Sequence, residues 1–278
     1  MNDLKLKKML EEFFLEDIGS GDVSVQFLFN DSIGEGKFIA KEDGIFVGQS
    51  IILEGYRLLD SNVECTFYKH DGQSIAKGDV IATIQGKMCA LLTGERVILN
   101  IVQRLSGIAS ITSEAVKRTN GSNTRLCDTR KTTPGLRMLE KYAVRCGGAY
   151  NHRHGLYDGV MIKDNHIEFA GSITNAVQKV REQIGYMVKV EVETETREQV
   201  KEAIEANVDV IMFDNRSPKE IITFKELVPS HIITEASGGI SLDNLHEYAR
   251  TGVDYISLGF LTHSARSLDI SFNVGNKN

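Results

Sequence analysis

The second half of the chain repeats one pattern, a short apolar run followed by a helical stretch, and this repeat restricts the fold more than any other feature. The runs after Asn120 are TRLCDT, GVMIKD, VKVEVE, VDVIMFD, HIITEAS and DYISLG. Strands that alternate with helices form parallel βα units, and nearly all-apolar strands are buried on both faces of a sheet. A full TIM barrel has eight units and about 250 residues. We therefore expect α/β architecture with an incomplete TIM-like barrel, and a doubly wound open sheet is the alternative.

The segment from about residue 33 to 86 instead shows short strands separated by turns. GKFIAKEDGIFVG alternates apolar and polar residues, and VECTFYKHDGQSIAKGDVIATIQG holds two more strands around the turn sequences HDG and KGD. SIILEGYRLLD has helical spacing, as does the later stretch from Ala90 to Thr119, in which Gly107 suggests a break between two helices. We predict an N-terminal α/β sandwich domain over 1–108 and the partial-barrel catalytic domain over 109–265. The C-terminal tail, 266–278, is expected to pack on the first domain.

Charge and composition exclude several classes of protein. The formal charge of -6 argues against a nucleic-acid binder, and no apolar stretch is long enough to cross a membrane. The N-terminus mixes both signs of charge with apolar residues at helical spacing, which indicates a surface helix rather than a secretion signal. The four cysteines form neither a C-x-x-C pair nor a metal-binding spacing, so we expect reduced thiols and a cytoplasmic protein.

Polar residues follow the apolar runs of the repeated pattern. In a βα barrel the functional residues lie at the carboxyl ends of the strands and in the loops that follow. One polar strand ending alone would mean little. Because several such endings are predicted at the same edge of the sheet, we expect a functional site there. The endings are Asp128, Thr129, Arg130, Lys131, Lys163, Glu193, Asp214, Ser237, Gly238, Gly239 and Gly259.

The stretch from Asp128 to Lys163 is basic although the whole chain is acidic. Such a pocket suits a small polyanion better than a polymer, and arginine forks match carboxylates and phosphates. The cations beside strand ends or glycine-rich turns are the ones we assign to this pocket: Arg130, Lys131, Arg153 and Lys163. Three others are spaced at i, i+4 and i+8 and are interpreted as coating a helix: Arg137, Lys141 and Arg145.

Two acids and two glycine loops complete the predicted site. Glu193 and Asp214 end consecutive strands and could hold Mg²⁺, which takes one or two carboxylates together with substrate phosphates. Glu191 faces the same side of its strand as Glu193, so the pattern does not choose between them. The glycine turns at 237–239 and 259 let the backbone approach a phosphate closely.

The motifs together resemble the quinolinate phosphoribosyltransferase family. The resemblance is carried by DTRKTTPGLRMLEKYAVRCGGAYNHRHGLYDGVMIKDNHI, VEVETE, VDVIMFDN, EASGGI and GVDYISLGFLTHSARSLDIS, and it extends from about Asp17 to Ser271. It implies that quinolinate and phosphoribosyl pyrophosphate give nicotinate mononucleotide, CO₂ and pyrophosphate in NAD biosynthesis. It also implies an N-terminal α/β sandwich, a partial barrel, and a homodimer with shared active sites, with a hexamer as the larger assembly seen in similar enzymes. Ala149 replaces a glycine common in the family.

The resemblance implies a role for each matching residue. Arg130, His152, Arg153 and Lys163 match the quinolinate pocket, and Arg104 matches the arginine that the neighbouring subunit donates. Thr129 and Lys131 complete the T-R-K element. Glu193 and Asp214 match the acids at the ribose and Mg²⁺, while the phosphate loops match Ser237, Gly238, Gly239, Leu258, Gly259 and Phe260. Lys131 and Lys163 are both candidates for the proton donor after loss of CO₂.

Three alternatives stay open at this point. HDGQSIAKGDVIATIQG resembles a biotinyl or lipoyl carrier hairpin, but Gly86-Lys87-Met88 lacks the expected sequence around a modified lysine, and modification of Lys87 would show in its mass. A barrel aldolase would use Lys163 as a Schiff base, which borohydride trapping would detect. A related phosphoribosyltransferase acting on another pyridine or pyrrole ring is the nearest alternative, and substrate comparison separates it.

Overall fold

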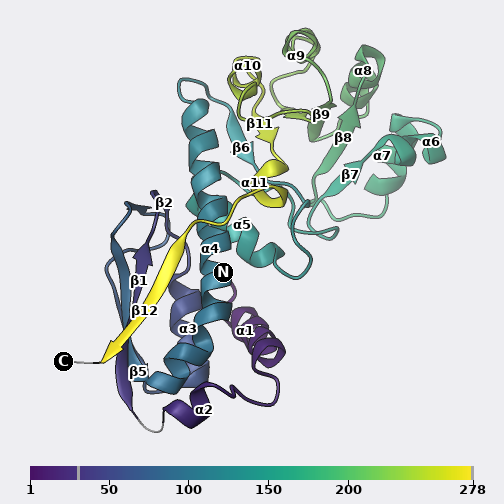
Figure 1. Cartoon of the computed structure of the whole chain (residues 1–278). Helices are drawn as coiled ribbons and strands as arrows, with labels where there is room; N and C mark the ends of the chain where they lie inside the picture. Colours follow the sequence, from purple (N-terminus) through teal and green to yellow (C-terminus); the bar gives the residue numbers. More distant parts are fainter. Residues whose placement is uncertain (30–31, 277–278) are drawn as a thin grey trace. The chain divides into compact units, whose positions relative to one another are not determined.

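The computed structural model describes residues 1–29 and 32–276 and divides into two compact units (Figure 1). Unit 1 contains Met1–Ser113, Met138–Gly148 and the chain from Ala265 onward, and unit 2 contains Glu114–Arg137 and Ala149–Ser264. The boundary that we placed at 108/109 falls inside a single helix, α4 (Met88–Arg118). Of the predicted C-terminal tail, residues 277 and 278 lie outside the described part of the chain.

Unit 1 is built on an antiparallel sheet with the strand order β12-β1-β5-β3. The burial of β1 alternates residue by residue, as expected of a strand with one face on a core. The final strand of the chain pairs with β1 from Gly34↔Asn276 to Ala40↔Ile270. The strands of the unit are β1 (Ile33–Ala40), β2 (Gly44–Ile45), β3 (Glu64–Phe67), β4 (Ser74–Ile75), β5 (Val80–Lys87) and β12 (Ile270–Asn276).

Helices and aromatic side chains form the core of unit 1. Phe38 of β1, Tyr56 of α3 and Phe272 of β12 are buried together, with ring centroids 4.7 to 6.3 Å apart. The predicted N-terminal helix is present and buries Leu6, Leu10 and Phe14 along one face. The helices are α1 (Asp3–Ile18), α2 (Val25–Leu28), α3 (Gln49–Leu59), the first part of α4, and most of α5 (Arg137–Cys146).

The predicted break at Gly107 is wrong, because α4 is one helix of 31 residues. A Cβ atom at Gly107 would lie 1.9 Å from the carbonyl oxygen of Arg266, so glycine is needed for the close approach of the returning chain. Gln103 fixes that approach by donating to the carbonyl of Ile270 at 2.7 Å and accepting from Leu268 N at 2.9 Å. Neither α4 nor any other helix among the described residues has the length and hydropathy to span a bilayer.

The close approach at Gly107 gives a prediction about stability. Gly107→Ala should lower the free energy of unfolding by about 1–3 kcal/mol, since the added methyl group meets backbone that cannot rotate away. Urea unfolding curves would measure the change. Gly275→Ala is the matched control because its Cβ would meet nothing within 4 Å. Equal stability of the two variants would contradict the packing argument.

Unit 2 is an all-parallel sheet with the order β6-β11-β10-β9-β8-β7. The last strand, β11, pairs with the first, β6, as strands do when a barrel closes, and the order does not reverse as in a doubly wound sheet. Within the described residues this sheet has six strands rather than eight, so the incomplete barrel is confirmed. The strands are β6 (Arg125–Cys127), β7 (Val160–Ile162), β8 (Val190–Thr194), β9 (Val210–Asp214), β10 (Ile233–Ser237) and β11 (Tyr255–Ser257).

Short loops with strong helix caps connect these strands to their helices. At α8, Thr196 accepts from Gln199 N while the Gln199 side chain returns a bond to the Thr196 backbone. At α9 Ser217 and Glu220 form the same capping box. Such caps start each helix within a few residues of the strand end and keep the carboxyl edge of the sheet ordered. The helices are α6 (Asp164–Ala170), α7 (Ile173–Arg181), α8 (Arg197–Glu205), α9 (Pro218–Lys225), α10 (Leu245–Ala249) and α11 (Phe260–His263).

Candidate active site

The carboxyl edge of the parallel sheet brings Arg130 and Arg153 close together. Burial lowers the pKa of Arg153, and the positive charge of Arg130 lowers it further, while the carboxylate of Glu191 acts in the opposite direction. Arg153 is held in place by donating from Nη1 to the carbonyl of Gly159 at 2.9 Å. Two neighbouring guanidinium groups, of which Arg153 is partly buried and Arg130 exposed, are suited to an anion with two negative groups.

A second part of the edge joins one lysine to two acids. Lys163, which follows β7, forms a short ion pair with Glu193 of β8. The pKa of Asp214, at the end of β9, is raised by burial and then by the negative charge of Glu193. Asn215 donates to Asp214 Oδ2 at 2.6 Å and adopts a left-handed backbone with φ 52°. Two carboxylates that repel each other across neighbouring strands form an oxygen donor set that fits Mg²⁺.

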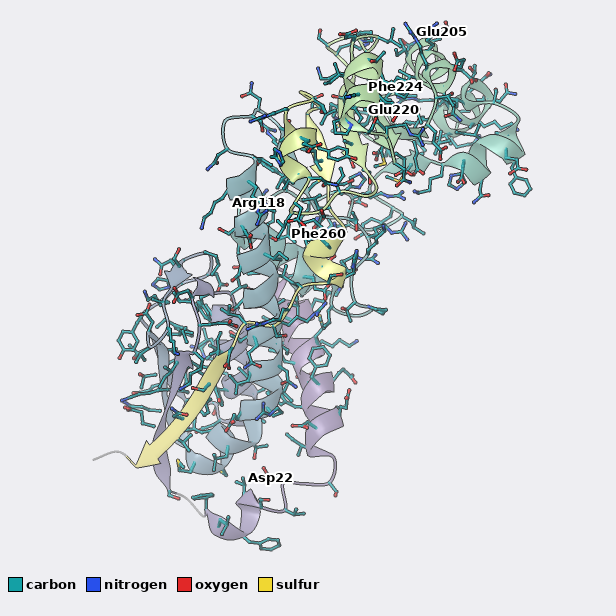
Figure 2. The ribbon with its side chains drawn as sticks, turned by 45° about the horizontal axis from the view of Figure 1, so that its top comes forward. Asp22, Arg118, Glu205, Glu220, Phe224 and Phe260 are labelled. Carbon is teal, nitrogen blue, oxygen red and sulfur yellow. The ribbon has the colours of Figure 1, made fainter. Side chains whose placement is uncertain are left out.

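Glycine turns after β10 and β11 line a cavity of about 460 Å³. Gly238 has φ +84°, and a Cβ there would lie 2.2 Å from Asn215 Oδ1, so only glycine fits. Lys131 lies across the cavity, and its backbone carbonyl accepts a bond from Thr262 at 2.8 Å. Phe260 begins α11 beside the cavity (Figure 2). The lining residues used here are Lys131, Ser237, Gly238, Gly239, Gly259, Phe260 and His263.

Arg118, in the last turn of α4, holds the chain that follows the glycine turn of β10. It donates to the carbonyl of Leu242 at 3.0 Å and pairs with Glu114 at 2.6 Å (Figure 2). Leu242 itself lines the cavity. The cavity wall is therefore tied to a long helix as well as to the sheet.

Two residues that we predicted to bind phosphate or substrate have other local roles. The Leu258 side chain is only 1% exposed, and its backbone N–H donates to the carbonyl of Cys127 at 2.9 Å. The Leu258 side chain thus packs in the core, so within the predicted phosphate loop at 258–260 it offers no exposed side chain. Thr129 accepts a bond from Lys131 N at 3.0 Å, which shapes the T-R-K turn.

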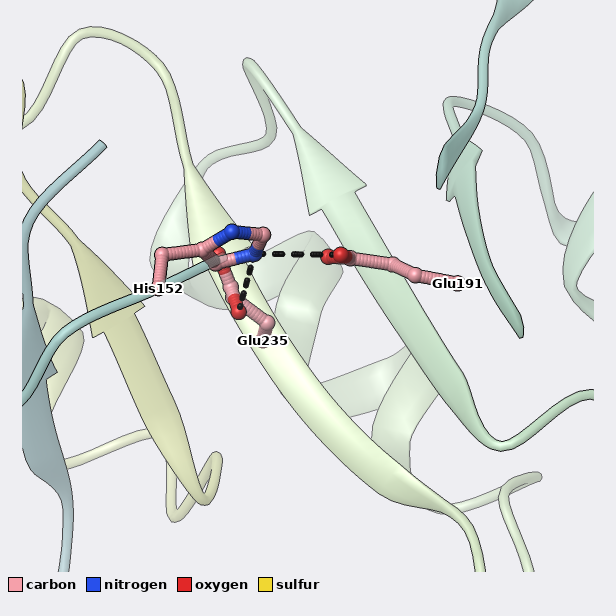
Figure 3. Close-up of side chains that lie close together, drawn as sticks. All are labelled: His152, Glu191 and Glu235. Atoms are coloured by element: carbon pink, nitrogen blue, oxygen red, sulfur yellow. Dashed lines mark ion pairs between the residues drawn. The ribbon is translucent and has the colours of Figure 1, made fainter. Parts of the chain in front are cut away.

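His152 lies in a buried cluster with Glu191 of β8 and Glu235 of β10 (Figure 3). Its Nε2 is 3.0 Å from Glu191 Oε2 and 3.6 Å from Glu235 Oε2. Burial, and then the negative charge of Glu191, raises the pKa of Glu235 to about 8, while His152 acts in the opposite direction. The cluster has the ligand types of a transition-metal site, but its imidazole distinguishes it from the oxygen set that Mg²⁺ prefers.

Sequence reasoning gave no role to three residues of this edge, although it placed Asp128 at a strand end. Asp128 is fully buried and accepts from His152 N at 2.9 Å and from the Asn151 side chain at 2.6 Å. Glu235 stands inside the apolar run HIITEAS, where a charged residue indicates a buried polar contact. His263 lines the glycine-lined cavity and follows Gly259 by one helical turn, which was the available signal.

The predicted shared arginine lies in unit 1. Arg104 donates from Nε at 2.8 Å and from Nη2 at 2.5 Å to Glu140 Oε1, and Glu140 is fully buried. Next to it, Lys141 is 1% exposed. Our interpretation that Lys141 coats a helix surface is therefore wrong, whereas Arg145 of the same set is exposed.

The chain matches known proteins over almost its full length. Residues 22–106 match the N-terminal domain of quinolinate phosphoribosyl transferase, and residues 108–273 match its C-terminal domain. A probable nicotinate-nucleotide pyrophosphorylase (carboxylating) of Bacillus subtilis is 58% identical, with 99% of this chain and 95% of that protein covered.

Solved structures give the same result. The nicotinate-nucleotide pyrophosphorylase from Francisella tularensis is 37% identical, with 99% of this chain and 98% of that chain covered and a TM-score of 0.95. NadC from Streptococcus pyogenes is also 37% identical, with 100% and 99% covered and a TM-score of 0.96.

Proposed function

The chain belongs to the quinolinate phosphoribosyltransferase family, and on this premise we propose which reaction its carboxyl-edge site performs. It transfers the phosphoribosyl group of phosphoribosyl pyrophosphate to quinolinate, with loss of CO₂. The products are nicotinate mononucleotide and pyrophosphate, in NAD biosynthesis. The observation that carries this assignment is the pair of guanidinium groups, Arg130 and Arg153, on the same sheet edge as a glycine-lined cavity of about 460 Å³.

Quinolinate has two adjacent carboxylates, which need concentrated positive charge to leave water and bind side by side. Arg130, Arg153 and Lys163 supply that charge, and His152 lies next to them in the chain and at the same strand ends. In this proposal the two neighbours in the T-R-K turn bind different substrates. Arg130 binds quinolinate, and Lys131, which lines the glycine-lined cavity, binds the sugar phosphate. These assignments are proposals that the electrostatic coupling of Arg153 with Arg130 supports.

The sugar phosphate occupies the cavity beside Lys131 in this proposal. The turn at Ser237, Gly238 and Gly239 and the turn at Gly259 and Phe260 present backbone N–H groups to the 5′-phosphate. His263 lines the same cavity and adds a donor that sequence reasoning missed. Glu193 and Asp214 would hold Mg²⁺, and when bound the ion would neutralise charge on the departing pyrophosphate.

The chemical steps then depend mainly on positioning and charge. The pyridine nitrogen forms a bond to the anomeric carbon as the bond to pyrophosphate oxygen breaks. Positive charge develops on the ribose, and the carboxylates of Glu193 and Asp214 stabilise it. The ring nitrogen becomes cationic, so the adjacent C–CO₂ bond breaks with its electron pair left on the ring carbon, which takes up a proton. Lys131 and Lys163 are the two candidate proton donors.

We also propose a cytoplasmic homodimer, with a hexamer as a larger assembly. Arg104 would complete the neighbouring subunit's quinolinate pocket. Large apolar side chains that a monomer leaves exposed support self-association: Leu156, Tyr157 and Phe169 are 73%, 83% and 91% exposed in unit 2. The four cysteines carry no disulfide, in keeping with a reducing compartment.

A direct assay tests the function. Protein, Mg²⁺, phosphoribosyl pyrophosphate and quinolinate labelled in the 2-carboxylate should give equal amounts of nicotinate mononucleotide and labelled CO₂. Nicotinate, which lacks that carboxylate, should react far more slowly in a parallel sample. Preferential turnover of nicotinate or of another ring would overturn the assignment, and so would product formation without CO₂.

Substitution of Arg104 tests the shared site. Arg104→Ala would break the ion pair with buried Glu140, so a loss of stability is part of its expected result. Arg104→Lys is therefore the better variant, because it keeps a positive charge near Glu140 and lacks the two-pronged fork. It should fold and raise the KM for quinolinate at least about 10-fold, in line with the loss of one charged hydrogen bond. Normal kcat/KM would contradict the role of Arg104.

A further inference from the structure

The two buried acids beside His152 have no part in the reaction as described so far. Glu191 is 6% exposed and Glu235 is 4% exposed, although isolated buried carboxylates are costly. Their Oε2 atoms both approach Nε2 of one imidazole, and their Oε1 atoms are buried without a hydrogen-bond partner among the described residues. The arrangement therefore concentrates two acids on one ring atom.

This geometry defines the hydrogen-bonding role of the ring. A carboxylate oxygen accepts, so at 3.0 Å from Glu191 Oε2 the Nε2 atom of His152 must carry a hydrogen and donate it. The backbone of His152 is fixed as well, because its N–H donates to Asp128, which also holds Asn151. Figure 3 shows the other ring nitrogen, Nδ1, on the side of the ring turned away from both carboxylates.

We propose that Glu191 and Glu235 are positioning residues that hold the His152 ring by its Nε2–H, so that the opposite edge of the ring is turned toward quinolinate. The proposal deepens the function above and rests on the role given there to His152. The physical logic is that of a carboxylate behind a metal-binding or catalytic histidine, which sets ring orientation and the nitrogen that donates.

The placement of the acids also explains why two are present. Glu191 faces two nitrogen-bearing side chains, since its carboxylate acts to raise the pKa of Arg153 and lies 3.0 Å from His152 Nε2. Glu235 lies on the next strand but one, with β9 between them. A ring held from two strands keeps its orientation when quinolinate arrives, which reduces the ordering needed on binding.

Kinetics of three variants test the proposal. Glu191→Leu should raise the KM for quinolinate about 10–100-fold, the range for loss of such supporting contacts. The KM for phosphoribosyl pyrophosphate should stay within about 2-fold, and Glu191→Gln, whose side-chain oxygen still accepts from Nε2, should recover part of the loss. Asp209→Asn is the control. Asp209 accepts hydrogen bonds from Val190 N and Arg181 and lies at the amino end of β9, whereas the site lies at the carboxyl end.

A double-mutant cycle gives the decisive comparison. In a His152→Gln background, Glu191→Leu should cause almost no further rise in the KM for quinolinate, because its effect passes through the ring. Equal losses in both backgrounds would overturn the proposal and leave only a packing role for Glu191. If His152→Gln itself leaves the KM for quinolinate unchanged, the assigned role of His152 fails instead.

A spectroscopic readout without substrate separates these two failures. The Nε2 proton of His152, identified by its absence in His152→Gln, should resonate at low field because it is shared with a buried carboxylate. Glu191→Leu should abolish this resonance, and Asp209→Asn should retain it. Retention in Glu191→Leu would show that the acid does not hold the ring, whatever the role of His152 in quinolinate binding.

Discussion

Asp214→Asn is expected to reduce kcat by about 10²–10³-fold while leaving quinolinate affinity nearly unchanged. We propose that its carboxylate binds the metal ion and stabilises the positive charge on the ribose. Both interactions are strongest in the transition state. Steady-state kinetics over a range of Mg²⁺ concentrations would measure the loss of turnover and the shift in metal dependence. Unchanged rate and unchanged Mg²⁺ dependence would exclude Asp214 from the site.

The same substitution should not weaken the fold. The pKa of Asp214 is raised in the folded protein by burial and by Glu193, so its negative charge destabilises the folded state above the ordinary pKa of an aspartate. A neutral Asn removes that repulsion, and Tm at pH 7 should be equal or higher. Asp209 immediately precedes the other end of the same strand. Asp209→Asn should show the opposite combination, normal turnover and a lower Tm, because its ion pair with Arg181 and its bond to Val190 N are lost.

Arg153→Ala is expected to lower kcat/KM for quinolinate by about 10²–10³-fold, which corresponds to about 3–4 kcal/mol of lost charged hydrogen bonding. The effect should be selective, because the KM for phosphoribosyl pyrophosphate depends on the glycine-lined cavity instead. Titration calorimetry with quinolinate would measure the loss directly. A similar loss for both substrates would indicate general disorder of the edge.

Arg153→Lys separates charge from geometry in this pocket. Lysine retains the positive charge but cannot make two parallel bonds to one carboxylate, so its kcat/KM should lie between those of Arg153→Ala and the unmodified enzyme. The bond from Arg153 to the carbonyl of Gly159 is lost in both variants, so their stabilities should be similar. Equal activity of Arg153→Lys and the unmodified enzyme would show that only charge matters there.

Periodicity made much of the fold predictable. The apolar runs from Leu126 to Ser257 are parallel strands, and the polar residues that end them share one edge, because parallel strands all point the same way. The six strands of this sheet correspond to the six apolar runs in the sequence. The break at Gly107 was a wrong prediction because glycine interrupts helices in general, and the sequence does not show that the carbonyl of Arg266, far along the chain, fills the space beside it.

The sequence and the tertiary structure contributed different parts of the candidate site. The sequence by itself determined which residues end each strand, so Arg130 and Lys163 followed from local pattern, whereas the choice of Glu193 over Glu191 needed the family resemblance. Only the tertiary structure decided that Glu191 and Glu235 meet at His152, that Leu258 turns into the core, and that His263 faces the cavity beside Lys131. The reason is that strand periodicity sets which face a side chain takes, whereas partners from different strands depend on register and packing, which are set by the whole sheet.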